Sequence, residues 1–382
     1  MVRQLVTIQR ITKIESIEGA DKIVKAQILG WQCVVGKDDF KEGDLCIYCE
    51  IDSLFPVTPE FDFLSKCHHR IKTIRLKGVI SQGLCLSLKY LEGKKFSSDT
   101  RENPTYNFKE GDDVTNLLGV TKWEPPELDR LMGEAKSLFP SFIPKTDETR
   151  VMLLQSLLDK YKGTLCYVSE KIDGSSLSVY LNDCQKCSGL GSMTNESETD
   201  VLICDNCKGT GKVYGVCSRN LELKQEGRNL LDNIFIKASI ELGMEEKLRK
   251  LNKNIALQGE LAGVGIQNNR LDLKTKNVYF FNAYDIDEKK YLNYEDFKNL
   301  ITSLDLNTVP IIDENFILNN DINGLVKYST DNSILNKDRL REGVVIRPLV
   351  EMKEEHVCKG ELPSNRVSFK VVSPEYLLEH GL

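Results

Sequence analysis

The stretch Glu170-Lys171-Ile172-Asp173-Gly174-Ser175-Ser176 decides how the chain is interpreted. Apolar-rich runs flank it, 165–169 on one side and 176–181 on the other, and both have the length and composition of β-strands. An Asp-Gly pair between two strands is typical of a tight turn. Taken alone, the pattern K-x-D-G therefore indicates only a turn that carries a solvated lysine.

Five segments downstream of this lysine each offer a group that a nucleotide site could use. They supply a guanidinium for a phosphate, a carboxylate at a strand end, an aromatic face for a base, a carboxylate before an apolar strand, and a lysine within a strand. In chain order these residues are Arg219, Glu260, Phe281, Glu342 and Lys370. Each one alone is better explained as surface charge or core. All five in one order favour a nucleotide site.

In this order the motifs resemble the covalent nucleotidyltransferase superfamily of DNA ligases, RNA ligases and capping enzymes. The pattern is most similar to ATP-dependent RNA ligases with an N-terminal OB domain, the fifth RNA ligase family. Further segments carry this resemblance: 139–150 (FPSFIPKTDETR), 259–263 (GELAG), 265–269 (GIQNN) and 81–84 (SQGL). The resemblance covers nearly the whole chain, apart from a cysteine-rich insertion.

The resemblance implies an ATP-dependent RNA ligase. Such an enzyme joins 3′-OH and 5′-phosphate ends through lysyl-AMP and adenylylated 5′-end intermediates, and RNA repair is the implied setting. It implies ATP and Mg²⁺ or Mn²⁺ as cofactors and RNA as the partner. A nicked duplex and an RNA–DNA junction stay open as forms of the substrate. We expect a monomer.

The resemblance also implies roles for single residues. Lys171 would carry AMP as a phosphoramidate, Glu260 would contact the ribose, and Phe281 would stack on adenine. Glu342 would hold the catalytic Mg²⁺ or Mn²⁺ through its waters, and Lys370 would contact the α-phosphate. The remaining nucleotide-binding residues that it implies are Arg150, Glu170, Ile172, Asp173 and Arg219.

The attacking lysine must lose its proton, against a reference pKa of about 10.4. Partial burial and nearby positive charge, from Lys370 and a hydrated metal ion, both lower the pKa of a lysine. We therefore expect a lowered pKa for Lys171. Many relatives have a second lysine in the last motif where this chain has Val372, so only one motif lysine is assured.

Two copies of the pattern C-x-x-C-x-G-x-G lie between the lysine and Arg219, at 184–191 and 204–211. Two C-x-x-C pairs supply four thiolates, enough to close one tetrahedral zinc site and leave no open position. We therefore predict a structural Zn²⁺ held by Cys184, Cys187, Cys204 and Cys207. The repeat resembles the zinc-binding region of DnaJ co-chaperones over these residues only, so we interpret it as an inserted zinc knuckle. Cys46 and Cys49 lie in an expected strand and are better explained by burial.

The first 115 residues contain short, closely spaced runs with strand character and turn residues between them. This pattern favours a small barrel of the OB type, which would bind nucleic acid. Candidate phosphate contacts, with ordinary surface charge as an equal alternative, are Arg70, Lys72, Arg75 and Lys77. Prolines punctuate 116–144, which we interpret as a linker, with a short helix expected at 128–138.

Residues 145–382 mix helices and strands and predict a nucleotidyltransferase (adenylation) domain with an antiparallel sheet, interrupted by the zinc knuckle at 184–211. The fold class is therefore α+β, an N-terminal OB-type β-barrel followed by this domain. Helices are expected at 148–161 and over most of 221–251, and the Asn/Asp-rich stretch 313–337 is expected to be irregular. Strands are expected at 165–169, 176–181, 255–260, 278–286, 343–347 and 367–372.

Composition agrees with a globular protein of two or three domains, with 382 residues, 41% hydrophobic and 28% charged. The formal net charge of −6 slightly disfavours nucleic-acid binding but allows a local basic groove. Neither a signal-peptide pattern nor a membrane-spanning apolar run is visible in the sequence, so we expect a cytoplasmic or other intracellular protein without membrane contact.

Two other functions fit parts of the sequence. A non-catalytic zinc adaptor that binds nucleic acid would use the barrel and the knuckle, but it does not explain Lys171, Glu342 and Lys370 together. A capping-type guanylyltransferase would prefer GTP. Its barrel normally follows the lysine domain, whereas here the barrel-like segment comes first.

Overall fold

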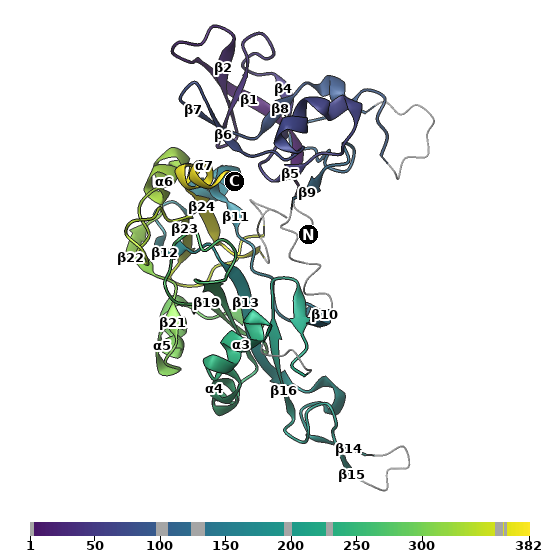
Figure 1. Ribbon diagram of the computed structural model, residues 1–382, viewed down its shortest axis with the longest axis vertical. Coiled ribbons are helices and arrows are strands. Elements are labelled where there is room, and N and C mark those ends of the chain that lie inside the picture. Colours follow the sequence, from purple (N-terminus) through teal and green to yellow (C-terminus); the bar gives the residue numbers. More distant parts are fainter. Residues whose placement is uncertain are drawn as a thin grey trace.

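The N-terminal part of the chain is a five-stranded antiparallel sheet that curls into a barrel (Figure 1). The computed structural model describes residues 4–96, 106–123, 134–194, 201–226, 232–355, 362 and 365–382. The strands pair in the order β3-β2-β1-β4-β8. Their bounds are β1 Val6–Ser16, β2 Ile23–Ile28, β3 Trp31–Gly36, β4 Leu45–Cys49 and β8 Leu84–Leu86.

Hydrogen bonds from β3 to strand β7 (Val79–Gln82) bring the two edges of this sheet together. The Gln32 side chain donates to the Ile80 carbonyl over 2.8 Å, and the Val34 amide donates to the Ser81 hydroxyl over 2.9 Å. Strands β2 and β3 alternate buried and partly exposed residues along their length, as a barrel wall requires. The expected barrel is therefore confirmed, and Cys46 and Cys49 are buried in it.

Shorter elements complete the N-terminal part. Strand β6 (Thr73–Leu76) forms a hairpin with β7, and β5 (Ser53–Leu54) pairs with β9 (Thr121–Lys122). The 3₁₀ helices are η1 (Pro59–Cys67) and η2 (Leu88–Leu91). Strand β9 joins the start of the expected linker to the barrel.

The second part of the chain contains two sheets (Figure 1). The larger has the order β10-β17-β16-β13-β18-β19-β20, with β21 beside β19, and the smaller has the order β11-β24-β23-β12-β22. Strands of the larger sheet are β10 Ala135–Leu138, β13 Ser175–Asp183, β16 Lys212–Cys217, β17 Leu221–Leu223, β18 Ile255–Ala262, β19 Asn277–Asp285, β20 Lys290–Tyr291 and β21 Asn307–Thr308. Strands of the smaller are β11 Thr149–Arg150, β12 Leu165–Lys171, β22 Ile311–Ile317, β23 Gly343–Pro348 and β24 Phe369–Val372.

The turn after Lys171 is the point where the chain crosses from one sheet to the other. Strand β12 belongs to the smaller sheet and ends at Lys171, and β13 begins the larger sheet at Ser175. Gly174 has to be small here, because a Cβ atom on it would lie 2.5 Å from the Leu261 carbonyl oxygen. The lysine is therefore held where the two sheets meet.

Helices cover these sheets. Helices α3, α4 and α5 share an apolar core with the larger sheet, through buried residues such as Phe235, Leu248 and Phe297. No helix in the described ranges is long and apolar enough to cross a membrane. The helices are α2 Gln155–Tyr161, α3 Ile234–Glu241, α4 Met244–Leu251, α5 Tyr294–Ser303, α6 Ile322–Ser329 and α7 Pro374–His380, and two further 3₁₀ helices are η4 Val151–Leu153 and η5 Gln185–Cys187.

The barrel packs directly against the second part of the chain. One apolar core contains barrel residues such as Trp31 together with Met152 and Leu377. The Gly30 amide donates to the Met152 carbonyl over 2.9 Å. Figure 1 shows the barrel at one end of the molecule and the hairpin of β14 (Ser192–Thr194) and β15 (Val201–Ile203) at the other.

Three expected helices differ from the structure. The segment 148–161 is helical only in its second half, because Thr149 and Arg150 pair with β24. Strand β17 occupies 221–223, where a helix was expected. Of the expected helix 128–138, residues 128–133 lie outside the described ranges, and 135–138 form β10, which pairs with β17. In each case a strand partner distant in sequence outweighs local helical character.

The expectation that residues 313–337 are irregular was also wrong in part. Strand β22 lies at the edge of the smaller sheet, pairing only with β12 among the described strands, so it tolerates polar residues. Helix α6 buries Ile322, Leu325 and Ser329, a spacing that keeps one face towards the core. All six strands expected between 165 and 372 are present, with small shifts of their ends.

Candidate active site

Lys171 faces the carboxylate of Glu342. Its ammonium donates to Glu342 Oε2 over 2.6 Å. The contact follows from strand register, because β12 and β23 are antiparallel and Lys171 lies opposite Gly343, directly after Glu342. Both side chains keep partial exposure, 26% for the lysine and 16% for the glutamate, towards a pocket between the barrel and the two sheets.

Glu260 lies on the other side of the same pocket. It comes from β18, where it is opposite Ser176 of β13. Burial raises the pKa of its carboxyl to about 8; the Lys171 ammonium opposes this, and the nearby Glu342 and Asp173 carboxylates add to it. The carboxyl groups of Glu342, Glu260 and Asp173 therefore all interact with the single ammonium of Lys171.

The pKa of Lys171 is raised, contrary to expectation. Burial lowers it, but the carboxylates of Glu342 and Glu260, and that of Asp173, outweigh burial and favour the charged ammonium. The pKa of the Glu342 carboxyl is also raised, because burial outweighs its attraction to Lys171. The contacts of Lys171 therefore favour an ion-paired ammonium over a free amine.

Asp173 is held by two residues that are distant in sequence. Its Oδ2 lies 2.5 Å from Arg270 Nη1 and accepts a hydrogen bond from the Tyr376 hydroxyl over 3.0 Å. Arg270 lies in the loop between β18 and β19, and Tyr376 lies in α7. One oxygen of the Asp in the K-x-D-G turn therefore has two partners.

Lys370 and Arg219 meet at a shared acid. The Lys370 ammonium lies 3.3 Å from Asp147 Oδ1, and Arg219 Nη2 lies 3.5 Å from Asp147 Oδ2. Both cations and Asp147 line the pocket. Arg219 is half exposed, whereas Lys370 is only 16% exposed. Their positions suit contacts with phosphate oxygens.

Phe281 lines the pocket beside a buried arginine. The guanidinium of Arg347 donates to the Phe281 carbonyl over 3.2 Å and to the Ser368 hydroxyl over 2.8 Å. It also lies 2.9 Å from Glu148, and it is only 3% exposed. Arg347 therefore fixes the backbone that presents the aromatic ring.

Glu170 and Ile172 line the pocket, but their side chains have other partners. The Glu170 carboxylate accepts hydrogen bonds from the Ser333 hydroxyl over 2.5 Å and the Ile334 amide over 2.8 Å. Ile172 packs in a small apolar cluster with Leu271. These contacts therefore fix the residues directly before and directly after Lys171.

Arg150 of β11 faces the wall of the pocket that the N-terminal part of the chain contributes. Its Nη2 is 3.6 Å from Asp52 Oδ2, and Arg70 binds the other oxygen of Asp52 over 2.7 Å. The Arg70 guanidinium stacks on Trp123, 3.4 Å from the ring centroid. All four residues line the pocket, so the barrel forms part of it.

Comparisons with known proteins identify the family of the chain. A family model described as RNA ligase matches residues 165–372, and one described as an OB-fold domain matches residues 5–88. The solved structure of Naegleria gruberi RNA ligase with pyrophosphate is 34% identical, with a TM-score of 0.76, and the match covers 100% of this chain and 99% of that chain. The chain belongs to the RNA ligase family.

Two further structures of the Naegleria gruberi RNA ligase are similar over 99% of both chains. A lysine-to-alanine mutant with ATP and Mn is 33% identical, with a TM-score of 0.76. A glutamate-to-alanine mutant with AMP and Mn is 32% identical, with a TM-score of 0.77. A search of curated proteins found no match. The comparisons give no support to the adaptor or the capping enzyme.

In this RNA ligase the pocket brings together all ten residues expected around the nucleotide, including Lys171. Sequence reasoning missed Arg270, Tyr376 and Asp147, and it gave Arg347 and Glu148 no role. Arg347 was the last residue of the expected strand 343–347, and Asp147 and Glu148 lay within the quoted segment 139–150. Nothing local marked Arg270 or Tyr376, because their partner Asp173 is distant in sequence.

Of the four candidate phosphate contacts on the barrel, Arg70 and Arg75 form ion pairs with other residues of the RNA ligase. Arg70 is buried and holds Asp52, and Arg75 holds Glu375 with two contacts of 2.8 Å. Lys77 is exposed and Lys72 is partly exposed. Val372 is buried in the core, so β24 contributes one cation to the pocket, Lys370.

The four knuckle cysteines of the RNA ligase converge between β13 and β16. Their sulfur atoms all lie within 4.8 Å of one another, and all four residues are buried. Cys184 and Cys204 sulfurs are 3.8 Å apart, and those of Cys187 and Cys207 are 3.6 Å apart. A tetrahedral zinc with Zn–S bonds of about 2.3 Å needs sulfur separations of about 3.8 Å, so this donor set fits the ion.

We predict that Glu342→Gln lowers the pKa of Lys171, because it removes the carboxylate that lies 2.6 Å from the ammonium. The measurement is an NMR titration of the lysine side-chain nitrogens, with Lys171→Arg to assign the signal. Glu314→Gln is the matched control, because it removes an equally short contact from Lys298, 2.7 Å, outside the pocket. An unchanged titration of Lys171 in Glu342→Gln would contradict the assignment of its raised pKa to that carboxylate.

Proposed function

We propose that this ATP-dependent RNA ligase joins 3′-OH and 5′-phosphate ends through an AMP carried on Lys171. The observation that carries this proposal is the position of Lys171, at the junction of two sheets, facing a carboxylate in a pocket lined by cations. The similar Naegleria gruberi enzyme has structures with ATP, with AMP and with pyrophosphate, which correspond to the nucleotide substrate, the transferred group and the leaving group of lysine adenylylation.

In the first step the Lys171 nitrogen would attack the α-phosphorus of ATP. An N–P bond forms, the bond from phosphorus to the bridging oxygen breaks, and pyrophosphate leaves. The ammonium must first give up its proton, although Glu342 and Glu260 stabilise the charged form. The nearest group that can accept this proton is the Glu342 carboxylate, whose Oε2 lies 2.6 Å from the ammonium.

The other pocket residues would bind and orient the nucleotide. We assign Phe281 to the adenine and Glu260 to the ribose. Lys370 and Arg219 would contact phosphate oxygens once these displace Asp147, with which both cations now pair. The remaining lining residues that we place around the nucleotide are Arg150, Glu170, Ile172 and Asp173.

Glu342 would hold the divalent cation. Its carboxylate offers hard oxygen donors and faces the pocket, which suits Mg²⁺ and Mn²⁺ alike. When bound, such an ion stabilises the negative charge that develops on the phosphate and the leaving pyrophosphate. The residues present therefore fit the cofactor, and we propose that either ion serves.

In the later steps AMP would pass to a 5′-phosphate, and a 3′-OH would then displace it. We propose a nicked duplex or an RNA–DNA junction as the substrate and a monomer as the active form, acting in RNA repair. The barrel would contact the strand, with exposed Lys77 and partly exposed Lys72 as candidate phosphate contacts. The described cysteines are outside disulfide bonds, which supports an intracellular location.

The knuckle would hold a structural Zn²⁺. Gly191 and Gly211 make its two turns possible, because both have positive φ and a Cβ on either would lie within 2.4 Å of a carbonyl oxygen of the opposite turn. Four protein thiolates leave no open position, so we assign the ion to stability rather than catalysis.

We predict that replacing Cys204 and Cys207 by Ser releases zinc and lowers the melting temperature, because the bound metal contributes to folding of the hairpin. Zinc content by atomic absorption and calorimetric unfolding measure the two effects. Replacing the buried Cys46 by Ser is the control, because it should leave the zinc content unchanged. A double mutant with the zinc content and melting temperature of the native protein would contradict the four-cysteine site.

The function is tested by sealing of a nicked RNA with a labelled 5′-phosphate. We predict that Lys171→Ala reduces sealing with ATP by about a thousandfold or more, because no other amine replaces the nucleophile. The same variant should still seal a nick whose 5′-end is already adenylylated, since the last step needs no lysyl-AMP.

Lys162→Ala is the matched control, an exposed lysine outside the pocket, and should seal both substrates normally. Sealing with ATP by Lys171→Ala at the native rate would contradict the proposal. So would failure of the native protein to seal any 5′-phosphorylated RNA.

A further inference from the structure

Helix α7 contacts both acidic residues that flank Lys171. Its Tyr376 hydroxyl donates to Asp173 over 3.0 Å. The amide of Ser373, which caps the helix, donates to the carbonyl of Glu342 over 2.9 Å. The helix therefore holds the turn that follows the lysine and the residue that pairs with its ammonium.

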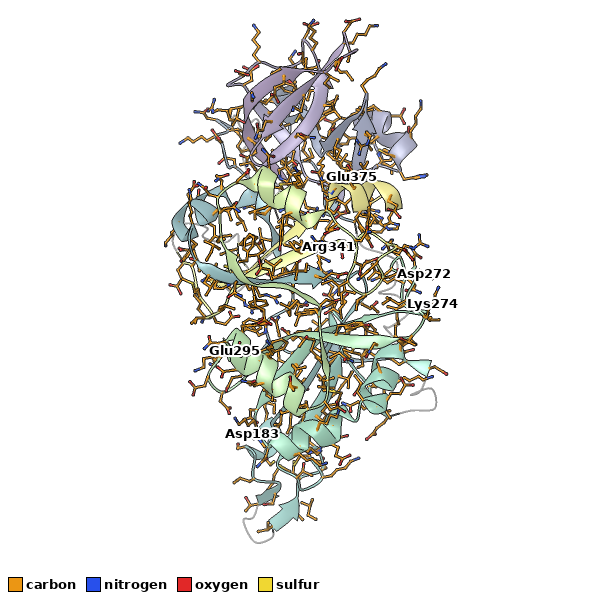
Figure 2. All side chains as sticks on the ribbon, turned by 90° about the vertical axis from the view of Figure 1, so that its left-hand side faces the viewer. Asp183, Asp272, Lys274, Glu295, Arg341 and Glu375 are labelled. Carbon is orange, nitrogen blue, oxygen red and sulfur yellow. The ribbon has the colours of Figure 1, made fainter. Side chains whose placement is uncertain are left out.

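The same helix is attached to the barrel. Arg75 of β6 donates to both carboxylate oxygens of Glu375, each over 2.8 Å, and the Thr73 amide donates to the Leu382 carbonyl over 3.0 Å. Figure 2 labels Glu375 on α7, directly below the barrel. A bidentate Arg–carboxylate contact fixes orientation as well as distance. The barrel and the lysine turn are thus connected through one short helix.

Asp173 has a second fixed partner, Arg270. Arg270 lies 2.5 Å from the same oxygen that Tyr376 contacts, and both pocket groups, Asp173 and Arg270, are only 15% exposed. Tyr376 is fully buried, so its hydroxyl has few alternatives to this contact. The Asp173 carboxylate has little freedom while both partners are in place.

We propose that α7 couples the docked position of the barrel to the geometry of the lysine turn, and that Tyr376 and Arg270 are positioning residues for attack by Lys171. The proposal rests on the lysyl-AMP reaction proposed above. A nucleophile displaced by about 1 Å loses much of its rate, so loss of either partner should slow adenylylation more than it weakens ATP binding.

The first test removes one hydroxyl. In Tyr376→Phe the ring stays in the core, and we expect lysyl-AMP formation at saturating ATP to slow about tenfold, the size typical for one hydrogen bond to a charged group, with little change in KM for ATP. Tyr294→Phe is the matched control, because it removes a hydroxyl that donates to Glu314 over 2.8 Å outside the pocket. It should adenylylate at the native rate.

The second test reverses the contact with the barrel. Arg75→Glu and Glu375→Arg should each slow lysyl-AMP formation about three- to tenfold, and the double reversal should restore it to within about twofold. The melting temperature should change little, because an exposed ion pair contributes little stability. Reversal of Arg10 and Glu110, a pair of similar exposure within the barrel region, should leave the rate unchanged.

Native rates in Tyr376→Phe and in both single reversals would overturn the proposal while leaving lysyl-AMP chemistry intact. A double reversal as slow as the single ones would overturn the coupling through α7. A native protein that forms no lysyl-AMP would instead refute the proposed function itself, so the two failures are distinguishable.

Discussion

The contact between Lys171 and Glu342 is the interaction on which the rest of the site depends. It joins the end of one strand to the start of its antiparallel neighbour, so register alone brings the two charges within 2.6 Å. The chain then crosses to the larger sheet through Gly174, which places Glu260 on the far side of the same lysine. The position of the nucleophile is therefore a property of the fold and does not rely on a flexible loop.

The carboxylates in this pocket favour the charged form of Lys171. Glu342, Glu260 and Asp173 raise the pKa of Lys171, and Lys370 and Arg219 pair with Asp147 a short distance away. The phosphates that we propose for the two cations would compete with Asp147. The divalent cation that we propose for Glu342 would compete with the ammonium. Lys171 is thus paired with Glu342, and Lys370 and Arg219 are paired with Asp147. Bound phosphates and a bound metal ion would take the place of these contacts.

The sequence predicted the order of the motifs, the barrel, both sheets' main strands and the cysteine cluster, because each has a local pattern. The sequence did not predict the features that depend on contacts between residues far apart in the chain. Residues 149–150 and 221–223 became strands because partners elsewhere in the chain pair with them. Arg270 and Tyr376 carry no local signal, and the raised pKa of Lys171 follows from three carboxylates that only the fold assembles. The sequence also carried no sign of the ion pair between Arg75 and Glu375, because the two residues are distant in sequence.

The most direct measurement is to incubate the native protein with ATP labelled at the α-phosphate and with Mg²⁺ or Mn²⁺, and then to locate the label by mass spectrometry of peptides. The account predicts one acid-labile AMP per chain, on the peptide that contains Lys171, with ATP and not with GTP. Label on another residue, label from GTP alone, or a folded protein that takes no label from ATP would contradict it.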